Sequence, residues 1–139
     1  MRVTIDTNVL LEGLKRKGHC GQIVDLWAAR KIEVCVSTAL ALEYEAVLKR
    51  HGGPNRTNQV EKVLQALLFR ATFVPIIFSY RPASPDPGDD MVIDCVMNGR
   101  TVLITSNTKD FIGAAEQLGF ELLTPKKFLA KYPKRYQEN

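Results

Sequence analysis

Acidic side chains gather at a few points of a chain that is basic as a whole. Four of the 15 acids fall in the run from Asp86 to Asp94, although the formal charge is +4. Two further acids, Asp6 and Asp110, come after short apolar runs rich in β-branched residues. Carboxylates that converge repel one another and raise one another's pKa unless a cation neutralises them. The pattern therefore indicates a site for a hard divalent ion, Mg²⁺ or Mn²⁺, which prefers oxygen ligands.

An ion of this kind has a definite chemistry. Held by carboxylates, it can turn a bound water into a nucleophile and stabilise the leaving oxygen of a phosphodiester. Mg²⁺ keeps several waters and binds through one or two carboxylates together with substrate phosphates. The acids thus predict phosphodiester hydrolysis, provided that the fold brings them together.

Two expected strands would carry acids to the same edge of a parallel sheet. The run from Arg2 to Ile5 is expected to deliver Asp6 to the carboxyl end of the first strand. The run from Thr101 to Thr105 is expected to be a second such strand, followed by Asn107 and Asp110. In open α/β sheets, ligands and catalytic groups collect at the carboxyl ends of the strands. We therefore expect these polar side chains to lie close to Asp6.

Each acid also has a purely structural interpretation. Asp6 can simply cap the helix that follows it, since aspartate accepts hydrogen bonds from the first backbone N–H groups of a helix. The same interpretation applies to Asp89, Asp90 and Asp110, which stand at the starts of other expected helices. Asp94 can support the site or face water. Asp86, before Pro87, is typical of a turn.

A further expected helix offers two glutamates. Glu45 has Lys49 at i+4, the favourable order for an exposed ion pair, so we expect Glu45 to be solvated. Glu43 lies at helical spacing from Leu40 and Val47 and so borders the packed face. We expect Glu43, rather than Glu45, to line a cleft.

Competing chemistries find little support. His19 and His51 lie in different loops without ligand spacing, which argues against zinc. The chain has no GxxxxGK[ST], GxGxxG or GxSxG motif, so phosphate-cradling loops and a nucleophile elbow are not expected. A phosphotransfer receiver domain also gathers carboxylates at strand ends. That alternative is weakened because its paired acids normally sit together after the first strand, where only Asp6 stands.

Strands and helices alternate along the chain, which predicts an α/β fold with a central parallel sheet of about five strands and helices on both faces. The expected strands cover residues 2–5, 31–37, 71–78, 101–105 and 120–123. The expected helices cover 9–14, 21–30, a stretch from 37 or 38 to the breaker at 51–55, a stretch from 57, and 89–98, 111–118 and 125–132. One domain over 1–139 is expected, with a frayed polar tail at 133–139.

Composition places the chain among ordinary globular proteins. It has 139 residues, of which 45% are hydrophobic and 24% charged. No apolar run approaches the length of a membrane span, so no membrane partner is expected. Cys35 and Cys95 stand among apolar residues and are expected to be buried thiols, whereas the surroundings of Cys20 are undecided. A reducing compartment follows, and we expect a cytoplasmic protein.

The order of these blocks resembles the PIN domain family, and in particular its prokaryotic members that act as toxins of toxin–antitoxin pairs. The likeness runs from Val3 to Leu129 and rests on four short blocks. They are the Asp-Thr-Asn at 6–8, Glu43 before 47–50, the acidic run at 86–90, and 105–111. The resemblance implies a three-layer, Rossmann-like α/β sandwich and a metal-dependent ribonuclease site of three or four acids.

Carried over residue by residue, the resemblance assigns Asp6, Glu43 and Asp89 as the first three acids. The fourth position departs from the commonest pattern, because Asn107 stands where many PIN domains have aspartate. Asp110 can substitute for it. We therefore expect the catalytic set Asp6, Glu43, Asp89 and Asp110, with metal ligands Asp6, Asp89 and Asp110. The expected supporting residues are Asn8, Asp90, Thr105 and Asn107.

Two functional hypotheses remain. The first is an endoribonuclease dependent on Mg²⁺ or Mn²⁺, with RNA as substrate and basic residues near 15–17 and 126–135 as backbone contacts. The second is a PIN-fold module that binds RNA or a protein with weak or no nuclease activity, as Asn107 would favour. The resemblance also implies an antitoxin partner and a homodimer.

Overall fold

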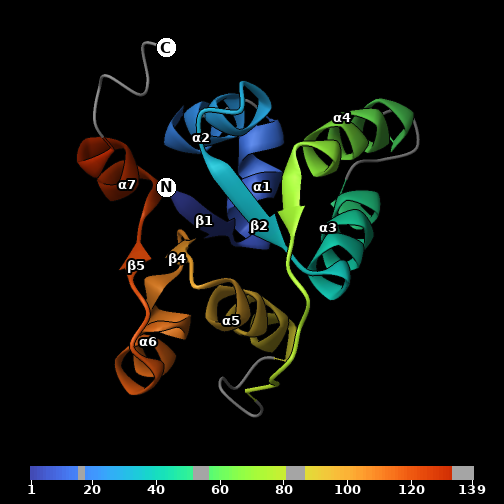
Figure 1. The fold of residues 1–139 in the computed structure, drawn as a ribbon. Coiled ribbons are helices and arrows are strands. Elements are labelled where there is room, and N and C mark those ends of the chain that lie inside the picture. Colours follow the sequence, from blue (N-terminus) through green and yellow to red (C-terminus); the bar gives the residue numbers. More distant parts are fainter. Residues whose placement is uncertain (16–17, 52–56, 81–86, 133–139) are drawn as a thin grey trace.

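A five-stranded, fully parallel sheet forms the centre of the computed structural model, which describes residues 1–15, 18–51, 57–80 and 87–132. The strand order is β3-β2-β1-β4-β5, so the first strand lies in the middle (Figure 1). The strands are β1 (Arg2–Ile5), β2 (Glu33–Val36), β3 (Ala71–Phe73), β4 (Val102–Ile104) and β5 (Leu122–Leu123). This order reverses direction between β1 and β4, which is the topological switch point of the sheet.

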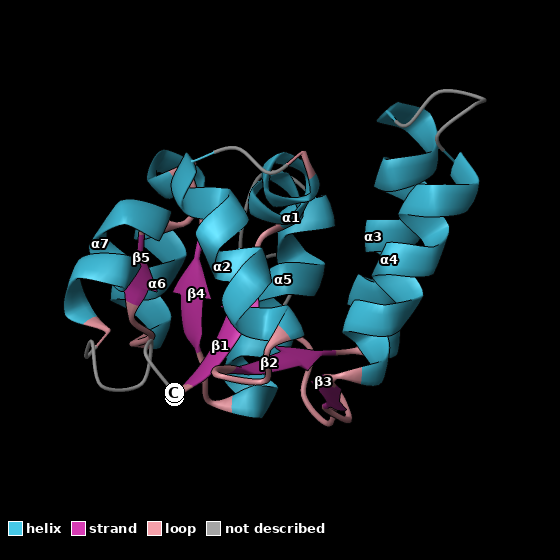
Figure 2. Cartoon of the chain, turned by 90° about the horizontal axis from the view of Figure 1, so that it is seen from above, coloured by secondary structure: helices cyan, strands magenta, loops and turns pink. Residues whose placement is uncertain are grey.

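Helices cover both faces of the sheet. Helices α1 (Thr7–Leu14) and α2 (Gly18–Ala28) lie on one face, and α5 (Pro87–Gly99) and α6 (Ile112–Leu118) lie on the other (Figure 1). Helices α3 (Thr38–His51) and α4 (Thr57–Phe69) stand side by side at the β3 end of the molecule (Figure 2). Helix α7 (Pro125–Lys131) packs against α2, and a short 3₁₀ helix, η1 (Thr108–Asp110), follows β4.

The core lies between the sheet and these helices. Val3, Ile5, Val34 and Val36 are fully buried, because a parallel sheet covered on both faces leaves no wet side. Trp27 of α2 is also fully buried. The apolar runs that predicted the first two strands are therefore the centre of the hydrophobic core.

The expected fold class is confirmed, but several strands are shorter than expected, the third most of all. The strand expected over 71–78 ends at Phe73. Pro75 has no N–H to donate to a sheet, and the side-chain oxygen of Asn98 accepts from the backbone N–H groups of Ile77 (2.9 Å) and Phe78 (3.1 Å). Ile77 and Phe78 are thus hydrogen-bonded to α5 instead of extending β3. The expected turn at Asp86 and the expected frayed tail lie outside the described residues.

Three of the helices end in a residue with positive φ. Gly119 closes α6 at φ 81°, as expected for a glycine. Arginines take the corresponding places after α2 and α5, where Arg30 has φ 58° and Arg100 has φ 53°. A residue with a Cβ costs about 1 kcal/mol in this left-handed region relative to glycine.

Within the described part of the chain, no helix is both long and apolar enough to cross a membrane.

Candidate active site

Asp6 lies at the switch point of the sheet, between the end of β1 and the start of α1. Its backbone N–H donates to the carbonyl of Ile104 in β4 at 2.9 Å. One carboxylate oxygen accepts from the N–H of Thr7 at 2.8 Å, and the other accepts from the hydroxyl of Thr105 at 2.7 Å. The residue is only 5% exposed. Asp6 is therefore both the expected helix cap and a carboxylate held in one orientation at the carboxyl edge.

A chain of hydrogen bonds leads from Asp6 along the loop after β4. The Thr105 hydroxyl, which donates to Asp6, accepts from the N–H of Asn107 at 3.0 Å. The side-chain amide of Asn107 donates to a carboxylate oxygen of Asp110 at 2.6 Å. Four of the expected site residues are thus connected in space. Asp110 is in η1 and does not cap α6, whose capping residue is Phe111.

Glu43 belongs to a turn of α3 that lies against the end of β1. The neighbouring Tyr44 is fully buried, and its hydroxyl donates to the carbonyl of Ile5, the residue before Asp6. Burial raises the pKa of Tyr44 well above its ordinary value, and the nearby charges of Cys95 and Asp6 add to this shift. The Glu43 side chain is 28% exposed and lies 3.8 Å from the Arg50 guanidinium. Glu45 is more exposed, at 45%, and pairs with Lys49 as expected.

Asp89 and Asp90 stand in the first turn of α5. The N-terminus of a helix favours negative charge, because its backbone N–H groups are unpaired and its dipole is positive there. Asp90 is 5% exposed and Asp89 is partly buried. Helix α5 contacts β1, β2 and α3, and α3 in turn contacts α1. The helices that carry Asp6, Glu43 and Asp89 thus form one contacting group.

The remaining expected residues have simpler surroundings. Asn8 is exposed on α1. Asp94 is buried and supports the loop before α5, where it accepts from the N–H of Tyr80 at 2.8 Å and from the hydroxyl of Ser79 at 3.4 Å. Asp94 therefore neither faces water nor bonds directly to Asp6 among the described contacts. The expected burial of Cys35 and Cys95 is confirmed.

Tyr44 is the residue that sequence reasoning missed. In the sequence it belongs to an apolar stripe of the expected helix, together with Leu40, Val47 and Leu48, and this pattern predicts only packing. Its hydroxyl nevertheless supports the strand end beside Asp6. The signal was present, because a tyrosine in a buried stripe needs an acceptor for its O–H group.

The donor chemistry of this edge suits a hard divalent cation. The side chains available are carboxylates, a hydroxyl and an amide, all of which offer oxygen. Among the described residues, no three His, Cys, Asp or Glu side chains are grouped closely enough to hold a metal ion by themselves. In proteins, Mg²⁺ keeps several waters and binds through one or two carboxylates together with substrate phosphates.

Comparisons with known proteins define the class. Residues 2–109 match the family profile of the PIN domain, so the chain belongs to the PIN domain family. The resemblance inferred from the sequence is thereby confirmed. Members of this family are generally nucleases and generally use divalent metal ions.

A solved structure supports the fold. The chain is similar to a chain in the crystal structure of VapBC2 from Rickettsia felis bound to a DNA fragment from their promoter. The match has a TM-score of 0.64 and 13% identity, and it covers 89% of this chain and 98% of the other. No curated protein sequence matches this chain.

Proposed function

We propose that this protein is a metal-dependent endoribonuclease that hydrolyses RNA phosphodiester bonds. The observation that carries the proposal is the orientation of Asp6 at the switch point, where Thr105 from the neighbouring strand holds its carboxylate at 2.7 Å. Binding sites of open α/β sheets form at this point. Membership of the PIN family adds the reaction class.

Each residue of the candidate site has a proposed role in this reaction. A Mg²⁺ or Mn²⁺ ion bound at this edge supplies an activated water and neutralises charge on the phosphate. Asp6, Glu43 and Asp89 are the proposed catalytic acids, and Asp110 joins Asp6 and Asp89 as a ligand, directly or through water. Thr105 fixes the orientation of Asp6, and its bond from the Asn107 N–H fixes the following loop. Asn8 and Asp90 are proposed to support the same edge.

Removing the Asp6 charge tests the assignment. Asp6→Asn keeps the shape of the side chain, so we expect RNA cleavage in the presence of Mg²⁺ or Mn²⁺ to fall by about 100-fold or more, because second-shell changes alone cost about 10–100-fold. Glu116→Gln, an exposed acid on α6, is the matched control and should cleave at the parental rate. Equal cleavage by Asp6→Asn and the parent would refute the proposal.

The alternative is a PIN-fold module that binds RNA or a protein with weak or no activity. Two observations favour it: Asn107 replaces an acid, and no three described acids, histidines or cysteines form a ready-made cluster. Calorimetric titration with Mn²⁺ separates the two functions. The nuclease requires Mn²⁺ binding that Asp6→Asn weakens, whereas the binding module should give the same titration for both proteins.

The biological role proposed here is that of a toxin held inactive by an antitoxin, acting in the cytoplasm. The similar chain in the VapBC2 structure and the free state of all three cysteines support this role and location. A single PIN domain over 1–139 and a homodimer are proposed with it. A neighbouring reading frame for a small protein that co-purifies with this chain and stops cleavage would support the antitoxin.

A further inference from the structure

Basic residues line the amino edge of the sheet, opposite the candidate active site. Arg2 begins β1, and Arg70 immediately precedes β3. Arg30, followed by Lys31, precedes β2, and Arg100 precedes β4. In the strand order β3-β2-β1-β4, an arginine therefore stands at the first residue of each strand or at most three residues before it. We call these five residues the arginine row.

Two members of the row hold backbone positions that suit glycine better. Arg30 closes α2: its N–H donates to Trp27 at 3.0 Å, and the Lys31 N–H donates to Leu26 at 2.9 Å. Arg100 occupies the equivalent place after α5, where the next N–H donates to Val96 at 3.1 Å. Both arginines have positive φ. A non-glycine residue with positive φ costs free energy, so its presence at two such positions points to a function for the arginine side chains.

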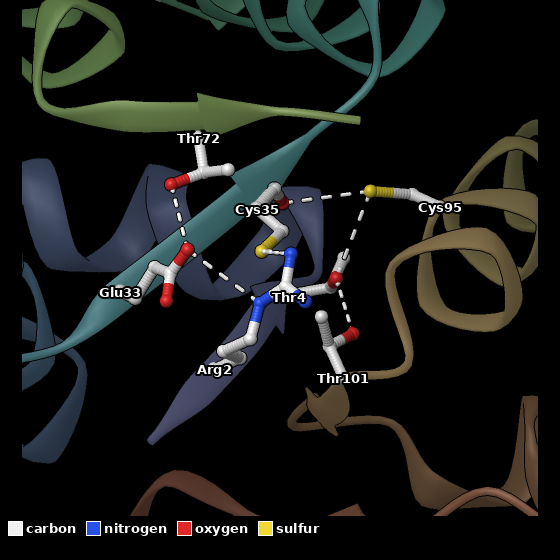
Figure 3. A network of polar contacts seen from close by, with 7 residues as sticks. All are labelled: Arg2, Thr4, Glu33, Cys35, Thr72, Cys95 and Thr101. Atoms are coloured by element: carbon white, nitrogen blue, oxygen red, sulfur yellow. Dashed lines mark hydrogen bonds and ion pairs between the residues drawn. The ribbon is translucent and has the colours of Figure 1, made fainter. Parts of the chain in front are cut away.

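Within the described residues, three of the four arginines of the row have no ion pair. The fourth is Arg2, whose guanidinium lies 3.5 Å from the carboxylate of Glu33, an acid beside the row (Figure 3). Among the described residues, the side chains of Arg30 and Arg100 make no ion pair or hydrogen bond, and both residues are exposed. The Arg70 guanidinium donates to the carbonyl of Ala66 at 2.9 Å. The row thus presents guanidinium groups to solvent.

The row also contains a concave site. A surface cavity of about 240 Å³ is lined by Arg30, Lys31, Ile32, Glu33 and Arg70. It has room for several groups the size of a water molecule, each of which takes about 30 Å³. A guanidinium offers N–H donors in a planar fork that matches two phosphate oxygens. The cavity therefore suits an anionic oxygen group.

We propose that the arginine row binds the sugar-phosphate backbone of RNA outside the cleavage site, an inference that rests on the proposed ribonuclease function. Neighbouring strands lie about 4.8 Å apart, so four strands spread the row over about 14 Å. A stacked nucleic-acid strand carries one phosphate about every 3.4 Å along its axis, so a strand that follows the row brings several phosphates to it. An RNA chain supplies such regularly repeated charge, whereas a protein would need a long run of acids.

The test measures binding without cleavage. Single-stranded RNA of about 20 nucleotides, labelled for fluorescence anisotropy, is titrated in the presence of a chelator. The double variant Arg30→Gly, Arg100→Gly removes two charges and relieves both left-handed backbones, so its melting temperature should be equal to or higher than that of the parent. Lys49→Gln, Lys62→Gln is the control, because it removes two exposed charges from α3 and α4, outside the row.

We expect the double arginine variant to bind about tenfold more weakly in low salt. The slope of log affinity against log salt should fall by about 1.4, since each contact to a single strand contributes about 0.7. The lysine control should keep at least most of the parental affinity. DNA of the same length should show the same loss, because the contact is to phosphate.

Three results would overturn the proposal. The first is that the arginine variant binds RNA as tightly as the parent, and the second is that the lysine control loses as much RNA affinity as the arginine variant. The third is found by titrating polyglutamate as a further ligand: if the arginine variant loses affinity for polyglutamate but not for RNA, the row binds an acidic protein. The chelator keeps this result separate from the nuclease assignment: inactivity of the parent would refute cleavage and leave the binding comparison intact.

Discussion

At the residue scale, Tyr44 explains how the end of β1 is stabilised without a neighbouring strand on one side. The β1–β2 pairs are Arg2–Glu33 and Val3–Val34, whereas the β1–β4 pairs extend to Ile5–Ile104. The Tyr44 hydroxyl donates to the Ile5 carbonyl at this point. One phenol thus connects α3, which carries Glu43, to the strand that carries Asp6.

Tyr44→Phe removes this hydroxyl and leaves a buried carbonyl without its donor. We expect the free energy of unfolding to fall by about 1–3 kcal/mol, which is the cost of an unsatisfied buried polar group. Urea denaturation of both proteins measures the change. Tyr80→Phe is the control, since Tyr80 is only partly buried, and it should change stability by less than about 0.5 kcal/mol. A Tyr44→Phe protein as stable as its parent would contradict this role.

The acids show what sequence can predict at this scale. The sequence allows two roles for Asp6, a helix cap and a metal ligand, yet in the structure the same carboxylate accepts hydrogen bonds from both Thr7 and Thr105. The sequence placed Asn107 and Asp110 near Asp6, because both follow a parallel strand. It could not predict that Asn107 would bond to Asp110, since that contact depends on the path of the loop through η1.

At the element scale, the crossing of α1 and α2 depends on the missing side chain of Gly13. A Cβ at this position would lie 2.4 Å from Cγ2 of Val24 and 2.7 Å from the carbonyl oxygen of Cys20. Neither distance is tolerable, and the second involves backbone. The two helices can therefore approach this closely only because residue 13 is glycine.

Two glycine substitutions should have opposite signs for this reason. Gly13→Ala forces α1 and α2 apart, and we expect it to destabilise the fold by about 1–3 kcal/mol. Gly113→Ala lies in α6, where a Cβ would meet nothing within 4 Å, and should stabilise the protein by about 0.5–1 kcal/mol. The melting temperatures of the two variants, compared with that of the parent, test both predictions. If both variants melted below the parent, the predicted difference in sign would be wrong.

The ends of the helices and strands are predicted less well from the local sequence pattern than their order. Apolar periodicity predicted the α-helices and strands of the described residues in the right order, because it reports burial, but it did not predict η1. It extended β3 through Ile77 and Phe78, which are in fact exposed. The side chain of Asn98 in α5 accepts hydrogen bonds from their backbone N–H groups. A contact between segments that are distant in sequence cannot be predicted from the local pattern.

At the scale of the whole molecule, buried acidic groups should weaken the fold in alkali. Burial raises the pKa of the Cys95 thiol from its ordinary 9.0 to about 11. Burial also raises the pKa of Cys35 and of Tyr44. Above pH 9 the unfolded chain loses these protons first, so the native state holds more protons and its stability falls as pH rises.

We expect Cys95 alone to account for about 2–3 kcal/mol lost between pH 9 and pH 11, since one pKa unit corresponds to about 1.4 kcal/mol. Cys95→Ser replaces the thiol with a hydroxyl that does not ionise in this range. Its unfolding free energy should therefore fall less steeply over the same interval. Urea titrations at several pH values measure the slope, and identical slopes for both proteins would show that Cys95 does not contribute.

The central position of β1 also decides when the proposed nuclease comes into existence. The Asp6 N–H pairs with Ile104, and the Asp6 carboxylate pairs with Thr105, although these residues lie far apart in the chain. A ribosome releases Asp6 well before Thr105, because 99 residues separate the two. A growing chain therefore carries the first proposed catalytic acid for all that time without the strand that orients it, and the proposed nuclease can form only after β4 has been made.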